Sequence, residues 1–444
     1  MSNEGLKKID SLNFGSKTTL NKDLSKNNQI KKKDDSSARP SNQLKGSLFG
    51  WYSVLSSSSL KENKIYSFSM FNEPLVIYKD KDSNVKCIKD LCPHRGASFI
   101  QGEIKDGELV CPYHGAKFSP NGACTNIDRI TCNHIVDTNY DNYAKKIHLY
   151  QYPCVEKDGY IYIYYTGKAK TNLSEFNIRT KLEDTLPDSF GFKISEYAYE
   201  EVTVDFKCDW SRIIENHLDI LHIFWVHGDT IPDKDVSKNV ITSFDQEILR
   251  EENQIQSKYN HKDKSKGEFI TIKFVPPGRV IIYKGEPNVS RYVQVLDHVP
   301  LANNRARVIV RHYRKFLKNK VFNKIIMFRQ LQQRIFYKVF QEDYMILRTQ
   351  TFNQQMGYIE KDNVKLLGED KMVQYYWDWL QNALNKDKPW DLHSTNFNTN
   401  TIHEDLGMLY PPENPSLAKK NIWSIRYNLF FRALIPIGFI ILIL

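Results

Sequence analysis

The 444-residue sequence lacks the features that mark several common protein classes. No apolar stretch follows the N-terminus, so we do not expect a secretory signal peptide. The seven cysteines have no regular spacing and do not predict a disulfide framework. No nucleic-acid recognition motif accompanies the net charge of +10. These absences favour a globular protein of a reducing compartment that does not bind nucleic acid.

Residues 1–48 lack the apolar side chains that a folded core needs. They carry ten Lys or Arg and five Asp or Glu among many Ser and Asn, which predicts a disordered basic tail. Organelle transit peptides are Arg-rich and poor in acidic residues, so this tail does not fit one. The remaining length suits two folded domains, which we place at residues 49–167 and 168–400, followed by a C-terminal tail at 401–444.

Two short loops carry the most informative residues of the chain. Cys92 and His94 form a C-x-H pair, and Cys111 and His114 form a C-x-x-H pair after sixteen further residues. Each loop offers one thiolate and one imidazole, and two of each are the ligands of a Rieske [2Fe-2S] cluster. Structural zinc is the alternative, but zinc sites usually place both cysteines in one loop and both histidines on one helix. The pattern therefore favours a Rieske cluster.

The surroundings of these loops differ from those of the Rieske proteins in cytochrome complexes. Ala97 and Tyr113 stand where those proteins have a disulfide, and Ala116 and Phe118 replace a Ser and a Tyr that donate hydrogen bonds near the cluster. Fewer donors favour the oxidised cluster, so we expect a potential at the low end of the Rieske range, about −150 mV. Such a potential suits the delivery of electrons to oxygen.

Hydrophobic periodicity predicts an antiparallel β domain followed by an α+β domain. Strands of the first domain are expected at residues 54–55, 64–68, 75–78, 85–88 and 159–165. Strands of the second are expected at 194–206, 268–274, 279–283, 292–299 and 306–313, and helices at 210–224, 320–350 and 370–385. We expect a helix-grip-like arrangement, in which the sheet wraps around helices.

A second metal site is indicated downstream of the loops. Helical spacing would place Asp219 and His222 on one face of a helix, with His227 just past its end. Two imidazoles and a distant carboxylate can form the facial triad of a mononuclear non-haem Fe(II) site, which leaves positions open for O₂. We choose Asp343 as that carboxylate, with Glu342 as its competitor. Taken alone, two such histidines are more often core residues than ligands.

In order, spacing and residue type, the two motifs together resemble the Rieske non-haem iron oxygenases. The resemblance covers residues 48–390 and is greatest to the chlorophyllide a oxygenase and pheophorbide a oxygenase group. It rests on Gly50-Trp51-Tyr52, Cys92 to Ala97, Glu215 to His222, Phe274-Val275-Pro276-Pro277, and Glu342-Asp343 followed by Gln350.

This resemblance implies cofactors, partners and a reaction. A ferredoxin or similar donor would reduce the [2Fe-2S] cluster, Asp219 would bridge the two metal centres, and O₂ would react beside a hydrophobic tetrapyrrole. Electrons in this superfamily usually cross between subunits, which implies a homotrimer. The leading expectation is a chlorophyllide a oxygenase of cyanobacterial type, which converts chlorophyllide a to chlorophyllide b by two successive hydroxylations of the C7 methyl group.

Three alternatives remain open. Pheophorbide a oxygenase, which opens the macrocycle, is the first, and another lipid or sterol Rieske oxygenase is the second. The third is a non-catalytic Rieske electron-transfer protein with a degenerate second site. The joint presence of Asp219, His222 and His227 argues against this third alternative.

The last sixteen residues, 429–444, are apolar except for Arg432. They are fewer than the roughly twenty residues that span a bilayer, so we expect an interfacial or half-inserted anchor. A C-terminal helix in an oligomer interface is the alternative. The basic stretch at 305–348 suits core packing, anionic lipid headgroups or an acidic electron donor. Together these features favour a cyanobacterial thylakoid or cytoplasmic membrane, or a plastid membrane in a eukaryote.

Overall fold

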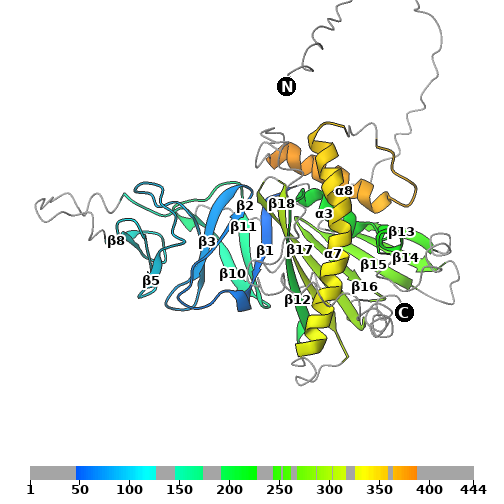
Figure 1. Cartoon of the computed structure of the whole chain (residues 1–444), viewed down its shortest axis with the longest axis horizontal. Helices are drawn as coiled ribbons and strands as arrows, with labels where there is room; N and C mark the ends of the chain where they lie inside the picture. The colour runs from blue at the N-terminus through cyan, green and yellow to red at the C-terminus, as the bar shows by residue number, and fades with distance from the viewer. Residues whose placement is uncertain are drawn as a thin grey trace, which may run out of the picture. The chain divides into compact units, whose positions relative to one another are not determined.

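The computed structural model describes residues 47–126, 146–173, 192–227 and 244–387, with short gaps at 252–253, 262–267, 287, 303, 317–325 and 359–363. Most of the predicted basic tail and all of the predicted membrane anchor lie outside this part of the chain. Within the described residues, no helix is long and apolar enough to cross a membrane. Figure 1 shows a β-rich N-terminal domain and a C-terminal domain built on one large sheet.

The N-terminal domain consists of three small antiparallel sheets, with strand orders β1-β11-β10, β2-β3-β4-β9 and β5-β6-β7-β8. The strands are β1 Gly50–Ser56, β2 Tyr66–Met70, β3 Glu73–Lys79, β4 Val85–Lys89, β5 Glu103–Lys105, β6 Glu108–Val110, β7 Lys117–Phe118, β8 Cys124–Asn126, β9 Gln151–Tyr152, β10 Cys154–Lys157 and β11 Tyr160–Tyr165. A 3-10 turn, η1 Ser57–Ser59, follows β1. The first domain is antiparallel β, as predicted.

Asp-Gly pairs close two of the hairpins in this domain. Asp106 (φ 54°) and Gly107 (φ 78°) join β5 to β6, and Asp158 (φ 52°) and Gly159 (φ 77°) join β10 to β11. Positive φ at both central residues is the requirement of a two-residue hairpin turn that matches the twist of the strands, and Asp-Gly is a preferred pair for it. These turns fix the register of the short strands.

The C-terminal domain has a seven-stranded antiparallel sheet in the order β12-β18-β17-β16-β15-β14-β13. Its strands are β12 Ala198–Phe206, β13 Phe244–Arg250, β14 Ile255–His261, β15 Glu268–Val275, β16 Arg279–Tyr283, β17 Tyr292–Ala302 and β18 Arg305–Arg314. A 3-10 turn, η4 Ile194–Glu196, precedes the sheet. The helices are α3 Trp210–Leu218, α4 His222–Val226, α7 Ile326–Gln355 and α8 Lys371–Asp387. α3 and α8 pack against the sheet together with α7, which crosses it in Figure 1, as the α+β prediction required.

Strand β18 is buried on both faces. Val308 and Val310 lie in the core formed with the helices. Ile309 and Tyr313, on the opposite face, pack in a cluster that contains Tyr160 of the N-terminal domain. The two domains therefore share a hydrophobic core across β18.

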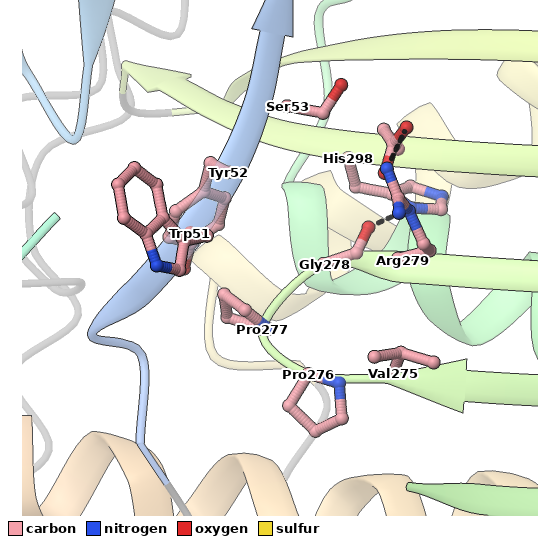
Figure 2. Close-up of a pocket in the computed structure, with 10 residues that line it drawn as sticks. Trp51, Tyr52, Ser53, Val275, Pro276, Pro277, Gly278, Arg279 and His298 are labelled. Carbon is pink, nitrogen blue, oxygen red and sulfur yellow. Dashed lines mark hydrogen bonds and ion pairs between the residues drawn. The ribbon is translucent and has the colours of Figure 1, made fainter. Parts of the chain in front are cut away.

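A small cavity lies where the two domains meet. Figure 2 shows Trp51 and Tyr52 of β1 on one side and Pro276 and Pro277, which lie between β15 and β16, on the other. A Cβ atom on the next residue, Gly278, would lie 2.5 Å from the carbonyl oxygen of His298. Glycine at this position therefore allows the two strands to approach closely.

The structure differs from the predicted elements in both domains. In the N-terminal domain, strands β5 to β10 were not predicted. The helix predicted at 210–224 is interrupted, because α3 ends at Leu218 and α4 begins at His222. Strands β13 and β14 were not predicted, and the strand predicted from Ile194 begins at Ala198. The other predicted strands of the second domain are present at nearly the expected residues.

Candidate functional site

The two cysteine loops of the N-terminal domain have the same backbone design. In each, the cysteine N–H donates to a carbonyl five residues later and the cysteine carbonyl accepts from a glycine N–H: Cys92 with Ala97 (2.8 Å) and Gly96 (2.8 Å), and Cys111 with Ala116 (2.8 Å) and Gly115 (3.0 Å). Both glycines have positive φ, 74° and 73°. The paired loops thus present equivalent side chains to one site.

The structure brings the four predicted cluster residues together. Cys92 and Cys111 are 3% and 2% exposed, whereas His94 and His114 are half-buried with ring centroids 4.8 Å apart. The hydrogen bond with the Cys92 thiol and the backbone N–H groups of Tyr113 and His114 together lower the pKa of Cys111 to about 6, against the effect of burial. Two adjacent sulfur atoms inside and two imidazoles toward the surface fit the donor set of a Rieske cluster.

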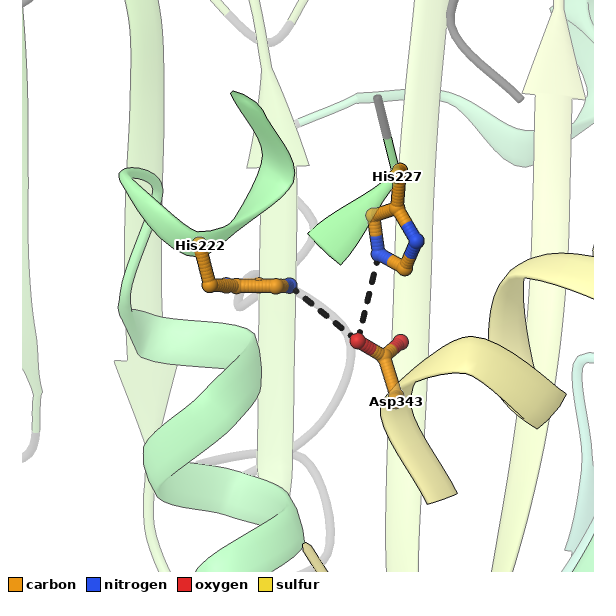
Figure 3. Close-up of side chains that lie close together, drawn as sticks. All are labelled: His222, His227 and Asp343. Carbon is orange, nitrogen blue, oxygen red and sulfur yellow. Dashed lines mark ion pairs between the residues drawn. The ribbon is translucent and has the colours of Figure 1, made fainter. Parts of the chain in front are cut away.

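A second group of metal-binding side chains lies in the C-terminal domain. His222, His227 and Asp343 place one ligand atom each within 4.8 Å of one another, the one such cluster of three among the described residues. The Asp343 Oδ1 atom lies 3.5 Å from Nε2 of His222 and 3.1 Å from Nε2 of His227 (Figure 3). Two imidazoles and one carboxylate fit the facial arrangement of non-haem Fe(II).

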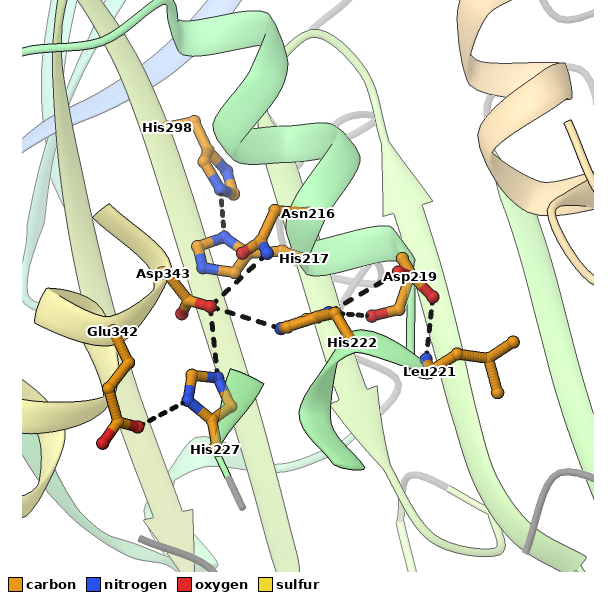
Figure 4. A network of polar contacts seen from close by, with 9 residues as sticks. All are labelled: Asn216, His217, Asp219, Leu221, His222, His227, His298, Glu342 and Asp343. Atoms are coloured by element: carbon orange, nitrogen blue, oxygen red, sulfur yellow. Dashed lines mark hydrogen bonds and ion pairs between the residues drawn. The ribbon is translucent and has the colours of Figure 1, made fainter. Parts of the chain in front are cut away.

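The second nitrogen of each imidazole is held by a protein acceptor. Nδ1 of His222 lies 2.5 Å from the Asp219 carbonyl oxygen, and Nδ1 of His227 lies 2.9 Å from Oε2 of Glu342 (Figure 4). Both Nε2 atoms are therefore left to face Asp343. Burial lowers the pKa of His227, but hydrogen bonds and charge from Asp343 and Glu342 raise it above its usual value overall.

Glu342 and Asp343 thus have different places in the site. Glu342 contacts the outer nitrogen of His227, whereas Asp343 is 2% exposed and faces both histidines. Such outer contacts orient the ligating histidines of metal sites. The geometry favours Asp343 over Glu342 as the carboxylate of the triad.

Asp219 lies in the break between the two short helices. Its backbone is extended, with φ −90° and ψ 112°, so it does not share a helical face with His222 as the sequence predicted. Its Oδ1 accepts a hydrogen bond of 2.7 Å from the Leu221 N–H, and its carbonyl fixes His222 as described above. The side chain is 31% exposed. Burial of the carboxylate raises its pKa.

A pocket adjoins the triad, with about 710 Å³ of empty space that includes open solvent. Its walls are apolar apart from the triad, Asp219, Gln294 and His217; the apolar residues are Ile220, Ile223, Ile270, Ile272, Ile282, Leu296, Phe336, Val339 and Phe340. Apolar walls with a few polar groups are typical of sites for organic ligands. The sequence did not identify Gln294 or His217 as site residues, although His217 lies inside the quoted Glu215 to His222 segment.

Family models match both domains of the chain. A model described as the Rieske [2Fe-2S] domain matches residues 50–147. A model of the vanillate O-demethylase oxygenase C-terminal domain matches residues 206–385. The two matches contain the cysteine loops and the His222, His227 and Asp343 cluster, respectively.

Relatives with different substrates are similar at comparable levels. The chloroplastic chlorophyllide a oxygenase of Chlamydomonas reinhardtii is 28% identical over 180 residues, which cover 40% of this chain and 24% of that protein. The toluene-4-sulfonate monooxygenase iron-sulfur subunit of Comamonas testosteroni is 26% identical over 181 residues, covering 41% of this chain and 46% of that protein. The matches thus span less than half of these relatives.

A solved structure extends the similarity to both domains. Dicamba monooxygenase bound to dicamba superposes with a TM-score of 0.58 and 17% identity, covering 76% of this chain and 97% of that one. A similarity at 17% sequence identity shows a shared fold and nothing more. Both described domains therefore share the fold of dicamba monooxygenase.

Proposed function

We propose that this chain, which belongs to the Rieske oxygenase family, oxidises an organic substrate bound beside His222, His227 and Asp343. The observation that carries the proposal is the adjacency of this triad to a largely apolar pocket. Cys92, His94, Cys111 and His114 would hold the [2Fe-2S] cluster, and the triad would hold mononuclear Fe(II). When bound, these groups supply one-electron transfer and the activation of O₂ as co-substrate.

The positions of the side chains indicate the path of electron transfer. The cluster cysteines are buried while both histidines reach toward the surface, so electrons leave by the imidazole edge. Asp219 is our candidate for the bridge between the two centres, because its carbonyl already holds His222. The electron donor is a ferredoxin or a similar protein. A hydroxylation consumes O₂, two electrons and two protons, converts C–H to C–OH and releases one water.

We propose chlorophyllide a as the substrate and chlorophyllide b as the product. Two observations support this choice: the similarity to chlorophyllide a oxygenases, and the apolar lining of the pocket beside the triad. Pheophorbide a is the second candidate, because the segment from Phe274 to Pro277 is shared by the group that contains both enzymes. A sterol or other lipid is the third. A small aromatic acid is a competing outcome, since the toluene-4-sulfonate relative is about equally similar.

One incubation distinguishes these substrates. Purified, iron-loaded protein receives chlorophyllide a, pheophorbide a or toluene-4-sulfonate with ferredoxin, its reductase, NADPH and O₂, and products are identified by absorbance and mass. A 7-formyl product is expected. A ring-opened product would assign pheophorbide a instead, and oxidation of the sulfonate alone would reject a tetrapyrrole. The His222→Ala variant is the control, because it should keep the Rieske EPR signal and form no product.

Assembly and location belong to the same proposal. We expect a homotrimer in which the cluster of one subunit serves the triad of the next, on a thylakoid or cytoplasmic membrane. Sedimentation equilibrium tests the trimer, and a monomer at micromolar concentration contradicts it. Flotation with anionic vesicles, compared between the full chain and a chain ending at residue 428, tests anchoring by residues 429–444. Equal flotation of both chains would exclude that anchor.

A further inference from the structure

We infer that His217 is a fixed hydrogen-bond acceptor in the active-site cavity, and that it holds the hydroxyl group of the first oxidation product. This inference rests on the proposed function, since a hydroxylated product must form beside the triad. It assigns to His217 a positioning role in the retention of a reaction intermediate. A chain of hydrogen bonds behind the imidazole supports this role.

The chain begins at a carbonyl group, which can only accept. Nδ1 of His298 lies 2.8 Å from the carbonyl oxygen of Gly278, so this nitrogen carries the proton (Figure 2). Nε2 of a neutral His298 is then an acceptor. It lies 2.7 Å from Nδ1 of His217, which must therefore be the donor (Figure 4). The tautomer of His217 follows: Nδ1 is protonated and Nε2 is not.

Both imidazoles are neutral in the folded protein. Burial lowers the pKa of His298 to about 4, and burial followed by the neighbouring His298 lowers the pKa of His217 well below its usual value. His298 is 1% exposed, whereas His217 keeps 8% of its surface accessible and lines the cavity. Because Nδ1 is turned to His298, the nitrogen left for the cavity is the unprotonated Nε2.

The other polar groups of this cavity are less suited to hold a hydroxyl group. His222, His227 and Asp343 would bind the metal, and the two oxygens of Asp219 face the Leu221 N–H (2.7 Å) and Nδ1 of His222 (3.8 Å). Gln294 can present either its oxygen or its nitrogen, so it does not discriminate between donors and acceptors. His217 is the neutral acceptor whose direction is fixed by the fold.

This arrangement has a consequence for sequential oxidation. A methyl group has no hydrogen-bond donor, but the alcohol formed from it carries an O–H that can donate to Nε2 of His217. The alcohol gains an interaction that the starting hydrocarbon lacks, so the cavity retains it for a second hydroxylation. A single net hydrogen bond corresponds to about five-fold in affinity.

Binding without turnover tests the inference. Under anaerobic conditions, the loaded protein is titrated with chlorophyllide a and its 7-hydroxymethyl derivative, and with 2-methylnaphthalene and 2-naphthylmethanol. For each pair, the preference for the alcohol should fall about five-fold in His217→Phe. Gln294→Met, which removes a polar group from the same wall, should keep the preference. Equal preferences in wild type and His217→Phe would overturn the inference.

Two variants of His298 test whether its hydrogen bond with His217, and not only the packing of the two rings, fixes the tautomer of His217. His298→Gln can still accept from His217 and donate to Gly278, so it should keep the preference, whereas His298→Leu should lose part of it. Solid-state ¹⁵N spectra of histidine-labelled, zinc-loaded protein should show an unprotonated Nε2 for His217 in wild type and mixed tautomers in His298→Leu. A protonated Nε2 of His217 in the wild-type protein would contradict the tautomer inferred from the hydrogen bonds.

The two ligand pairs distinguish a failure of the His217 role from a failure of the chlorophyllide assignment. If the naphthalene pair shows the preference but neither chlorophyllide binds, His217 keeps its role and the tetrapyrrole assignment is wrong. If chlorophyllide a binds and is oxidised while neither alcohol is preferred, the assignment stands and the role of His217 is wrong. Rieske EPR signals and metal content of each variant confirm that it is folded.

Discussion

At the scale of single residues, two neighbouring carboxylates have separate tasks because they lie on one helix. Consecutive residues of an α-helix point about 100° apart, so Glu342 and Asp343 of α7 cannot face the same atom in the same way. Asp343 faces Nε2 of both histidines, and Glu342 reaches around to Nδ1 of His227. The sequence analysis chose Asp343 but kept Glu342 as its competitor, because the roles depend on how α7 is rotated against the sheet.

Iron binding should respond differently to loss of each carboxylate. Asp343→Asn removes the one anionic ligand, and we expect the mononuclear iron to be lost. Glu342→Gln keeps an oxygen that can accept from His227, so iron affinity should fall about 10- to 100-fold, as for outer-contact residues in other metal sites. The mononuclear iron content per Rieske cluster, measured by mass spectrometry and EPR, is compared between the two variants. Greater iron loss in Glu342→Gln would reverse the assignment.

A second residue-scale prediction concerns pH. Burial lowers the pKa of His312 to about 3, against about 6.5 in the unfolded chain. Between these values the unfolded chain binds more protons, so the free energy of unfolding decreases as the pH falls. From pH 7.5 to pH 5 the contribution of His312 is about 2 kcal/mol.

The matched variant for this pH effect is His312→Phe. It removes the titrating group and keeps an aromatic ring against Phe336, whose ring centroid lies 3.6 Å from that of His312. Urea unfolding at both pH values should show a smaller loss in the variant, by about 2 kcal/mol. His298 contributes equally to both proteins and cancels. If wild type and His312→Phe lose the same unfolding free energy between pH 7.5 and pH 5, His312 is protonated at pH 5 in the folded protein as it is in the unfolded chain.

At the scale of elements, the sequence predicted most of the β structure of the C-terminal domain but missed two strands and one helix break. Strands β15 to β18 alternate clearly, whereas β13 and β14 carry polar residues on both faces, such as Gln246 and Lys258, and gave no period-2 signal. The break at Asp219 was not predicted, because the helical spacing of the side chains continues through it. In the break, the Asp219 side chain accepts from the Leu221 N–H, and the following His222 faces Asp343.

This break leads to a prediction about Asp219. The side-chain oxygen accepts from the Leu221 N–H, as an N-cap does, and Asn is as effective as Asp at such a position. Asp219→Asn should therefore keep thermal stability and iron content but slow the oxidation of the reduced cluster in a single turnover. Asp219→Ala should cost about 1 kcal/mol in addition. Unchanged cluster oxidation in both variants would remove Asp219 from the electron path.

At the scale of the whole molecule, buried arginines on β18 join the two domains. Arg311 has a fully buried side chain, donates to the carbonyls of Asp158 (2.8 Å) and Gly159 (2.5 Å), and pairs with Glu201 at 2.7 Å. Its guanidinium carbon lies 3.3 Å from the ring centroid of Tyr160. Because Asp158 and Gly159 form a hairpin turn of the N-terminal domain, this one side chain links that turn to the large sheet.

Removal of this link should uncouple the domains. Arg311→Met removes the partner of two carbonyls and of the part-buried Glu201, which we expect to cost about 1 to 3 kcal/mol. Calorimetry should then resolve two unfolding transitions in place of one, because the shared core at β18 no longer has its polar anchor. Arg305→Met, at the exposed start of the same strand, is the control and should unfold like wild type. A single transition at an unchanged temperature in Arg311→Met would show that the apolar contacts of Ile309 and Tyr313 hold the domains together without it.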